Sequence, residues 1–163
     1  MRPTYKRTPV RPFSSEDQEQ EAVIEWARLS QGRYPELKLL HHIPNEGKRS
    51  LQTAGRLKSL GMLAGVPDLH LPVPRGAYCG LFIEMKYDKG TVTTEQKDYL
   101  IRAAEEGNYC CICYTAEDAI TAITEYINKT PYNPFMLWPN TAILNVGYKR
   151  VLKDEESCRG EQP

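Results

Sequence analysis

The chain has no long apolar run, and this absence bears first on where the protein works. None of the apolar stretches in its 163 residues approaches the ~18 residues that span a membrane. The amino-terminal segment, from Met1 to Lys6, also lacks the apolar core of a secretory signal peptide. The two absences predict a cytoplasmic protein that does not engage a membrane.

Cysteine occurs in an odd number, which argues against a disulfide framework in an intracellular protein. The five cysteines are Cys79, Cys110, Cys111, Cys113 and Cys158. Three of them lie within one apolar segment that is typical of a buried strand, and no second Cys/His pair follows at zinc-finger spacing. We therefore predict core cysteines there and no zinc site.

The chain has no excess of either charge, because 21 Lys/Arg residues balance 21 Asp/Glu residues. The distribution is uneven, however: five Lys/Arg and one acid lie between Lys38 and Met62. A basic cluster suits a phosphate backbone, although a solvated basic surface is the simpler interpretation. The residues that we predict to contact phosphates are Lys48, Arg49, Arg56 and Lys58.

The length fits one domain with two flanking segments. Residues 1–13 hold three prolines, four basic residues and no periodicity, and predict a flexible basic arm. Residues 14–130 predict helices near 14–32, 53–60, 93–106 and 115–128, and strands at 37–43, 69–71, 80–87 and 109–114. Residues 131–163 form an extension whose apolar part could pack on the domain or meet a second subunit. Its charged end is predicted to be disordered.

Charged residues interrupt the strand predicted at residues 80–87. Glu84 and Lys86 are two positions apart, so their side chains point to the same face, opposite to the apolar ones. Carboxylates and ammonium groups are rarely buried without a partner. If Asp68 reaches the same place from the preceding strand, two carboxylates and one lysine converge.

Two converging carboxylates predict a site for Mg²⁺ or Mn²⁺, which prefer oxygen ligands. Such a cation polarises a phosphoryl oxygen and lowers the pKa of a bound water. Lys86 could orient that water or stabilise the charge that develops on phosphorus. The matching substrate is a phosphodiester. The structural alternative is a buried salt bridge, for instance between Asp68 and Lys86.

These residues resemble the signature of the PD-(D/E)xK nuclease superfamily. Beyond Pro67-Asp68 and Glu84-Met-Lys86, the resemblance to its VRR-NUC family rests on Gly65-Val-Pro-Asp-Leu69, Phe82-Ile-Glu-Met-Lys86, Gln96-x-x-Tyr99, and Glu16-x-x-x-Gln20 before Val23, Ile24 and Trp26. It implies an α/β (α+β) fold with a restriction-endonuclease-like core, in which helices flank a central mixed β-sheet. Stand-alone members are typical of phages and prophages, which implies the cytoplasm of a bacterial host cell.

The resemblance also implies roles for individual residues. Asp68 and Glu84 would hold Mg²⁺ or Mn²⁺ together with the backbone carbonyl of Met85, and Lys86 would be the catalytic lysine. Gln96 would lie at the edge of the site. Glu16 matches the first-helix acid of the family, which acts near the metal or through water. The choice among the helix acids stays open, since the candidates are Glu16, Glu19, Glu21 and Glu25.

The implied activity is divalent-metal-dependent hydrolysis of DNA without an organic cofactor. Compact members of the family suggest a homodimer that acts on branched DNA, so the leading hypothesis is a structure-selective endonuclease resembling a Holliday junction resolvase. The enzymatic alternative is a nuclease for flaps, 5′ ends or unspecific DNA. The non-enzymatic alternative is a DNA-binding module whose Asp/Glu/Lys cluster is structural.

Overall fold

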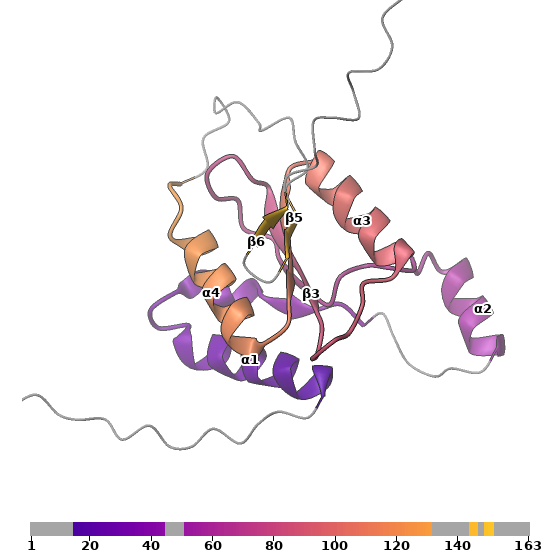
Figure 1. Cartoon of the computed structure of the whole chain (residues 1–163). Coiled ribbons are helices and arrows are strands. Elements are labelled where there is room, and N and C mark those ends of the chain that lie inside the picture. The colour runs from indigo at the N-terminus through magenta and orange to yellow at the C-terminus, as the bar shows by residue number, and fades with distance from the viewer. Residues whose placement is uncertain (1–14, 45–50, 132–143, 147–148, 152–163) are drawn as a thin grey trace, which may run out of the picture.

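A mixed β-sheet with helices on both faces forms the centre of the protein (Figure 1). The computed structural model describes residues 15–44, 51–131, 144–146 and 149–151. The six strands follow one another in the sheet in sequence order: β1 (His41–His42), β2 (Leu69–Leu71), β3 (Gly80–Met85), β4 (Asn108–Cys113), β5 (Leu144–Val146) and β6 (Lys149–Val151). The pairs β3–β4 and β4–β5 are parallel and the other pairs antiparallel. The predicted α/β (α+β) class with a central mixed sheet is confirmed.

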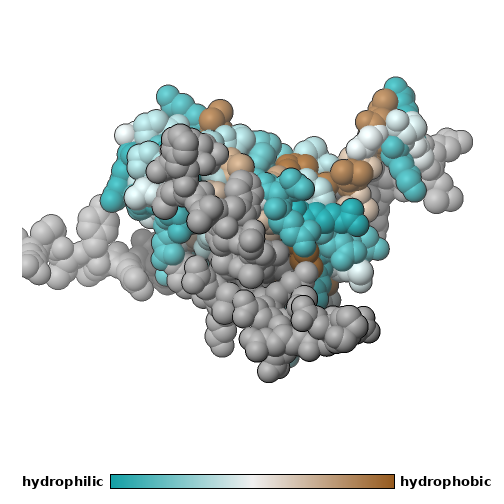
Figure 2. All heavy atoms as spheres, turned by 90° about the horizontal axis from the view of Figure 1, so that it is seen from above, coloured by the Kyte–Doolittle hydropathy of each residue, from teal (hydrophilic) through white to brown (hydrophobic). Residues whose placement is uncertain are grey.

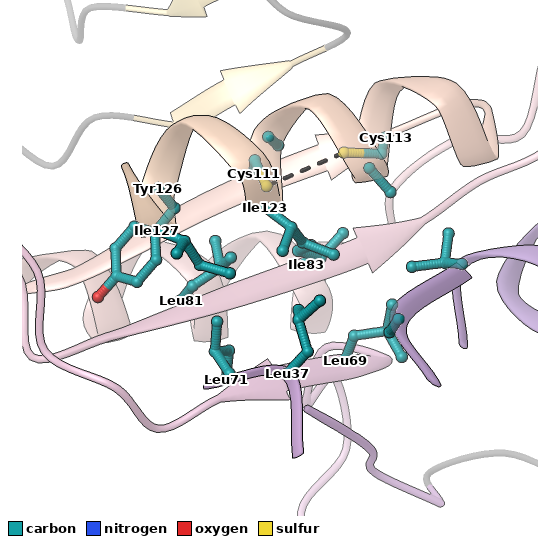
Figure 3. Packing of buried hydrophobic residues seen from close by; sticks show 14 of the residues in the cluster. Leu37, Leu69, Leu71, Leu81, Ile83, Cys111, Cys113, Ile123, Tyr126 and Ile127 are labelled. Carbon is teal, nitrogen blue, oxygen red and sulfur yellow. Dashed lines mark hydrogen bonds between the residues drawn. The ribbon is translucent and has the colours of Figure 1, made fainter. Parts of the chain in front are cut away.

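Three helices pack on the sheet: α1 (Glu16–Ser30), α3 (Thr94–Glu105) and α4 (Ala116–Ile127). The alternation of side chains along β3 decides which helix meets which face. Leu81 and Ile83 belong to the cluster that includes side chains of α1 and α4, and Phe82 belongs to the cluster with α3. Figure 3 shows the first cluster, with side chains of β2, β3, β4 and α4 facing one another. Both faces of β3 are therefore buried.

Helices α1 and α3 begin at polar N-cap residues, as the sequence predicts. Ser15 Oγ accepts the backbone N–H of Gln18 at 3.3 Å at the start of α1. Thr93 and Gln96 form a reciprocal capping box at the start of α3. These caps satisfy amides that have no partner within the helix and so fix where each helix begins.

The strand predicted at residues 37–43 is wrong in its first half. Residues Pro35–Leu39 form a 3₁₀ helix, η1, and only His41–His42 pair with β2. Pro35 occupies the start of η1, where the fixed backbone angle of proline suits a helical turn and its missing N–H costs nothing. Leu37 then turns inward and is buried in the core. The helix predicted at 53–60 is present as α2 (Leu51–Ser59).

The described part of the carboxy-terminal segment pairs with the sheet. β5 runs parallel to β4 with Cys110 opposite Leu144, and β6 returns antiparallel to β5. Of the apolar part, Leu144–Val146 therefore pairs with the sheet of the same domain, and residues 134–143 lie outside the described residues. The predicted arm at 1–13 and the charged end at 152–163 lie outside the described residues.

The predicted core cysteines are confirmed. Cys110, Cys111 and Cys113 are buried and free, and burial raises the pKa of the Cys110 thiol to about 12.

The surface in Figure 2 is mainly hydrophilic with small apolar patches on the face displayed. Large apolar residues that are exposed include Leu60 and Leu63, which follow α2. Among the described helices, none has the length and apolar character to cross a membrane.

Candidate active site

The predicted site residues meet at the carboxyl end of β3. Leu69 of β2 pairs with Ile83 of β3 in antiparallel register, so Asp68, one residue earlier, lies opposite Glu84. Asp68 Oδ2 accepts the backbone N–H of Met85 at 2.8 Å. The register of one hairpin therefore brings the two carboxylates of the predicted site together.

Glu84 is the centre of this cluster, and its side chain is fully buried. Its Oε1 accepts hydrogen bonds from Lys86 Nζ at 2.7 Å and from Gln96 Nε2. The other end of the Gln96 amide, Oε1, accepts the backbone N–H of Thr93 at 2.9 Å within the capping box. The cap of α3 thus fixes Gln96 against Glu84.

One oxygen of Glu84 has no hydrogen-bond partner among the described residues. Oε2 is buried without a hydrogen bond from any described residue. Burial, and then the nearby charge of Asp68, raise the pKa of Glu84 from its ordinary 4.5 to about 7, although Lys86 opposes the rise. A buried carboxylate oxygen without a donor is costly. This conflict would be relieved by a proton or by a cation.

Lys86 is also buried and contacts a second acid. Its Nζ lies 3.6 Å from Glu16 Oε1 on α1, in addition to the bond with Glu84. Burial alone would lower the pKa of Lys86, but the hydrogen bond and charge of Glu84, with Glu16 and Asp68, outweigh it and raise the pKa. Lys86 is therefore held as an ammonium group between the carboxylates of Glu84 and Glu16.

The structure places only one of the four first-helix acids beside Lys86, and that acid is Glu16. Glu19 is buried and instead accepts the backbone N–H of Ala116, the first residue of α4, at 2.6 Å. Glu21 and Glu25 are exposed. The spacing alone does not choose between Glu16 and Glu19, because they lie seven and four residues before the buried Val23 and both share its face of the helix.

The two predicted phosphate contacts that the structure describes do not join this cluster. Arg56 and Lys58 are exposed on α2, which lies away from the sheet in Figure 1. Lys48 and Arg49 lie outside the described residues. Their contact with DNA stays a prediction.

Sequence reasoning gave Gly65 no role beyond the motif, but its backbone packs against the start of α3. Gly65 adopts φ +77°, and a Cβ there would lie 2.7 Å from Gln96 N and collide with the carbonyl of Glu95. Only glycine combines this backbone angle with such a close approach. Gly65 therefore couples the loop that carries Asp68 to the helix that carries Gln96.

Sequence reasoning also missed a link from α1 to Asp68. His42 Nδ1 lies 2.9 Å from the backbone carbonyl oxygen of Asp68 and 3.0 Å from Gln20 Nε2. Gln20 follows Glu16 by one helical turn, so both face the same side of α1. The spacing of Glu16-x-x-x-Gln20 held this signal, but nothing in the sequence paired His42 with Asp68.

Asp68 and Glu84 are the residues that could hold a divalent cation. Within the described ranges, no three His, Cys, Asp or Glu side chains converge closely enough to form a complete cage. Mg²⁺ is usually held by one or two carboxylates, with waters and substrate phosphate as further ligands. The buried and unpaired Oε2 of Glu84 beside a second carboxylate fits that requirement.

Comparison with known proteins identifies the family. The VRR-NUC domain family model matches residues 7–117. A solved structure, described as a VRR_NUC domain protein, is similar with a TM-score of 0.65 and 29% sequence identity, over 76% of this chain and 96% of that chain. No protein of curated function matches the chain. The family match covers more than half of the sequence, and the chain therefore belongs to the VRR-NUC family and carries a nuclease-type domain.

Proposed function

We propose that the protein is a divalent-metal-dependent DNA endonuclease that hydrolyses phosphodiester bonds, with the structure selectivity of a Holliday junction resolvase. The observation that supports it best is the convergence of Asp68, Glu84 and Lys86, in which Glu84 Oε2 is buried without a partner. A purely structural salt bridge seldom leaves a buried carboxylate oxygen unpaired, because the large majority of buried polar atoms in native folds have a hydrogen-bond partner.

Each residue of the cluster has a role in this proposal. Asp68 and Glu84 hold Mg²⁺ or Mn²⁺, which when bound supplies a Lewis acid and lowers the pKa of water. Gln96 holds Glu84 in place through its amide. The Lys86 ammonium group donates to the water or to the phosphate oxygen on which charge develops. Glu16 orients Lys86 from α1.

The substrate preference rests on the family resemblance. A homodimer presents two symmetric sites, which suit paired incisions in a four-way junction. The alternative substrates are flaps, 5′ ends and unspecific duplex. The carbonyl of Met85 as a further ligand and the cytoplasm of a bacterial host cell as the location belong to the same proposal.

The decisive test is cleavage of labelled four-way junction, flap and linear duplex DNA in Mg²⁺, in Mn²⁺ and in EDTA. Symmetric nicks confined to the junction, and only with a divalent cation, are expected. Equal cutting of linear duplex would refute the junction preference and leave an unspecific nuclease. Cutting that persists in EDTA would refute the metal dependence.

Single substitutions in the cluster test the roles proposed for its residues. Asp68→Ala and Lys86→Ala should each reduce cleavage by at least about 10²-fold, since each removes a group that stabilises the transition state. DNA binding should remain largely intact in both. Lys89→Ala is the matched control, because Lys89 is exposed three residues after Lys86. Thermal unfolding of each variant separates lost chemistry from lost fold, and wild-type cleavage by either variant would contradict the proposal.

A further inference from the structure

We propose that a groove between α1 and β1 is a track for the phosphate backbone of one DNA strand, with Arg28 and Lys38 as its contacts. This α1–β1 groove has a volume of about 380 Å³. Its walls include Arg28 and Gln31 from α1, Lys38 from η1, and His41 and His42 from β1. The inference rests on the proposed nuclease function and names where its substrate lies.

The charge of the α1–β1 groove suits a polyanion. None of the described residues that line it is acidic. Arg28 and Lys38 are exposed, and neither forms an ion pair with another described residue. By contrast, Arg75 is bound to Glu36 and Lys86 to Glu84. Cations without a carboxylate partner are available to neutralise phosphates.

The groove lies next to the candidate active site, because its lining residue His42 contacts the backbone carbonyl of Asp68. Its lining combines Arg28 and Gln31 of α1 with His42 of β1. At the near end, His42 contacts both Gln20 and the carbonyl of Asp68. Gln20 and Arg28 are eight residues apart, or about 12 Å along the axis. A strand in the groove would therefore meet Arg28 a few nucleotides from the scissile phosphate.

A second cavity shows why the α1–β1 groove is preferred. This larger cavity, about 590 Å³, lies over α3 and is lined by Leu63, Phe82 and Tyr99. Three carboxylates, of Glu95, Asp98 and Glu106, also line it, against the single cation of Arg102. The net negative charge of this lining would repel a phosphate backbone. The smaller α1–β1 groove is therefore the better candidate for the DNA track.

The test measures DNA binding in EDTA, where cleavage is absent, by fluorescence anisotropy on a labelled four-way junction and on linear duplex. The double variant Arg28→Ala/Lys38→Ala removes both proposed contacts. The matched control, Lys97→Ala/Arg102→Ala, removes the same two residue types from exposed positions on α3. Each phosphate contact contributes about 0.9 to the slope of log affinity against log salt on duplex DNA. The slope should fall by about 1.8 in the double variant and remain at the wild-type value in the control.

Two further measurements keep the test specific. Arg28→Lys/Lys38→Arg retains both charges and should retain the wild-type slope. A neutral methylphosphonate, placed in turn at each position within a few nucleotides of the cut, should weaken wild-type binding at one position. That loss should vanish in Arg28→Ala/Lys38→Ala, because the contact is already absent. Thermal unfolding confirms that these surface variants are folded.

The outcomes separate this inference from the proposed function. If the wild type cuts DNA in Mg²⁺ but the double variant binds with the wild-type slope, the groove is not the track and the nuclease proposal stands. If the wild type neither binds nor cuts DNA, both proposals fail. An equal loss of slope in the control would show that any surface cation contributes, and would also overturn the groove.

Discussion

Replacing Glu84 by glutamine should change the stability of the metal-free protein in a way that depends on pH. The substitution keeps the shape of the side chain and removes its titration. It also weakens the pairing with Lys86, which adds a cost that does not vary with pH while Lys86 stays protonated. The informative quantity is therefore the difference in unfolding free energy between Glu84→Gln and wild type, followed as a function of pH.

The sign and size of this pH-dependent difference follow from the pKa values of Glu84 in the unfolded and folded states. The ordinary value is 4.5, and the folded value is raised to about 7 by burial first and Asp68 second. Below the ordinary value both states are protonated and Glu84 has no effect. As pH rises from 4.5 toward 7, the unfolded chain releases its proton first, so wild-type stability falls, and the penalty is complete above about 7. At about 1.4 kcal/mol per pKa unit, the full penalty is about 3 kcal/mol.

Urea unfolding in EDTA, followed by circular dichroism between about pH 4 and pH 8, measures this difference. Glu84→Gln should gain about 3 kcal/mol relative to wild type across that range. His70, whose pKa is lowered by burial and then by His41, acts with the opposite sign, but it is present in both proteins and cancels. Glu105→Gln removes an exposed carboxyl and serves as the matched control. A difference that does not vary with pH would refute the conflict inferred at Glu84. Added Mg²⁺ should restore part of the wild-type loss by binding only the folded state.

Other predictions concern the supports of the site. Gly65→Ala should destabilise the fold by about 1–3 kcal/mol and reduce cleavage, because the loop and Gln96 must separate; unchanged melting and cleavage would contradict that coupling. Glu19→Gln should lower stability by about 1–2 kcal/mol through its weaker bond to the start of α4, with cleavage per folded molecule unchanged. Arg56→Ala/Lys58→Ala should flatten the salt dependence of DNA binding by about 1.8 in slope, and an unchanged slope would remove α2 from the interface.

The centre of the site could be predicted from sequence because its signal is local. Glu84 and Lys86 share a face by the period of a strand, and a short hairpin brings Asp68 beside them. Polar caps marked the starts of the helices for the same reason: each depends on residues within one turn. These inferences needed no knowledge of how distant segments pack.

The supports of the site could not be predicted because they depend on packing between segments far apart in sequence. The rotation of α1 is set by burial of Val23 and by Glu19 reaching α4. The bond from His42 to Asp68 requires that β1 lie beside β2. The first half of the strand predicted at 37–43 is wrong for a local reason, because a short apolar segment does not exclude a 3₁₀ turn.

The cluster around Glu84 also explains why a stable fold would retain such a costly arrangement. Gln96 and Lys86 both donate hydrogen bonds to Oε1 of Glu84. No described residue donates a hydrogen bond to the buried Oε2. A hydrophobic residue at this position would avoid the penalty, since β3 is otherwise apolar and buried. Local rules are broken most often where function requires it. The unpaired oxygen, the raised pKa and the held ammonium group are therefore one feature: a charge conflict that the folded protein preserves and that a cation with its phosphate substrate would resolve.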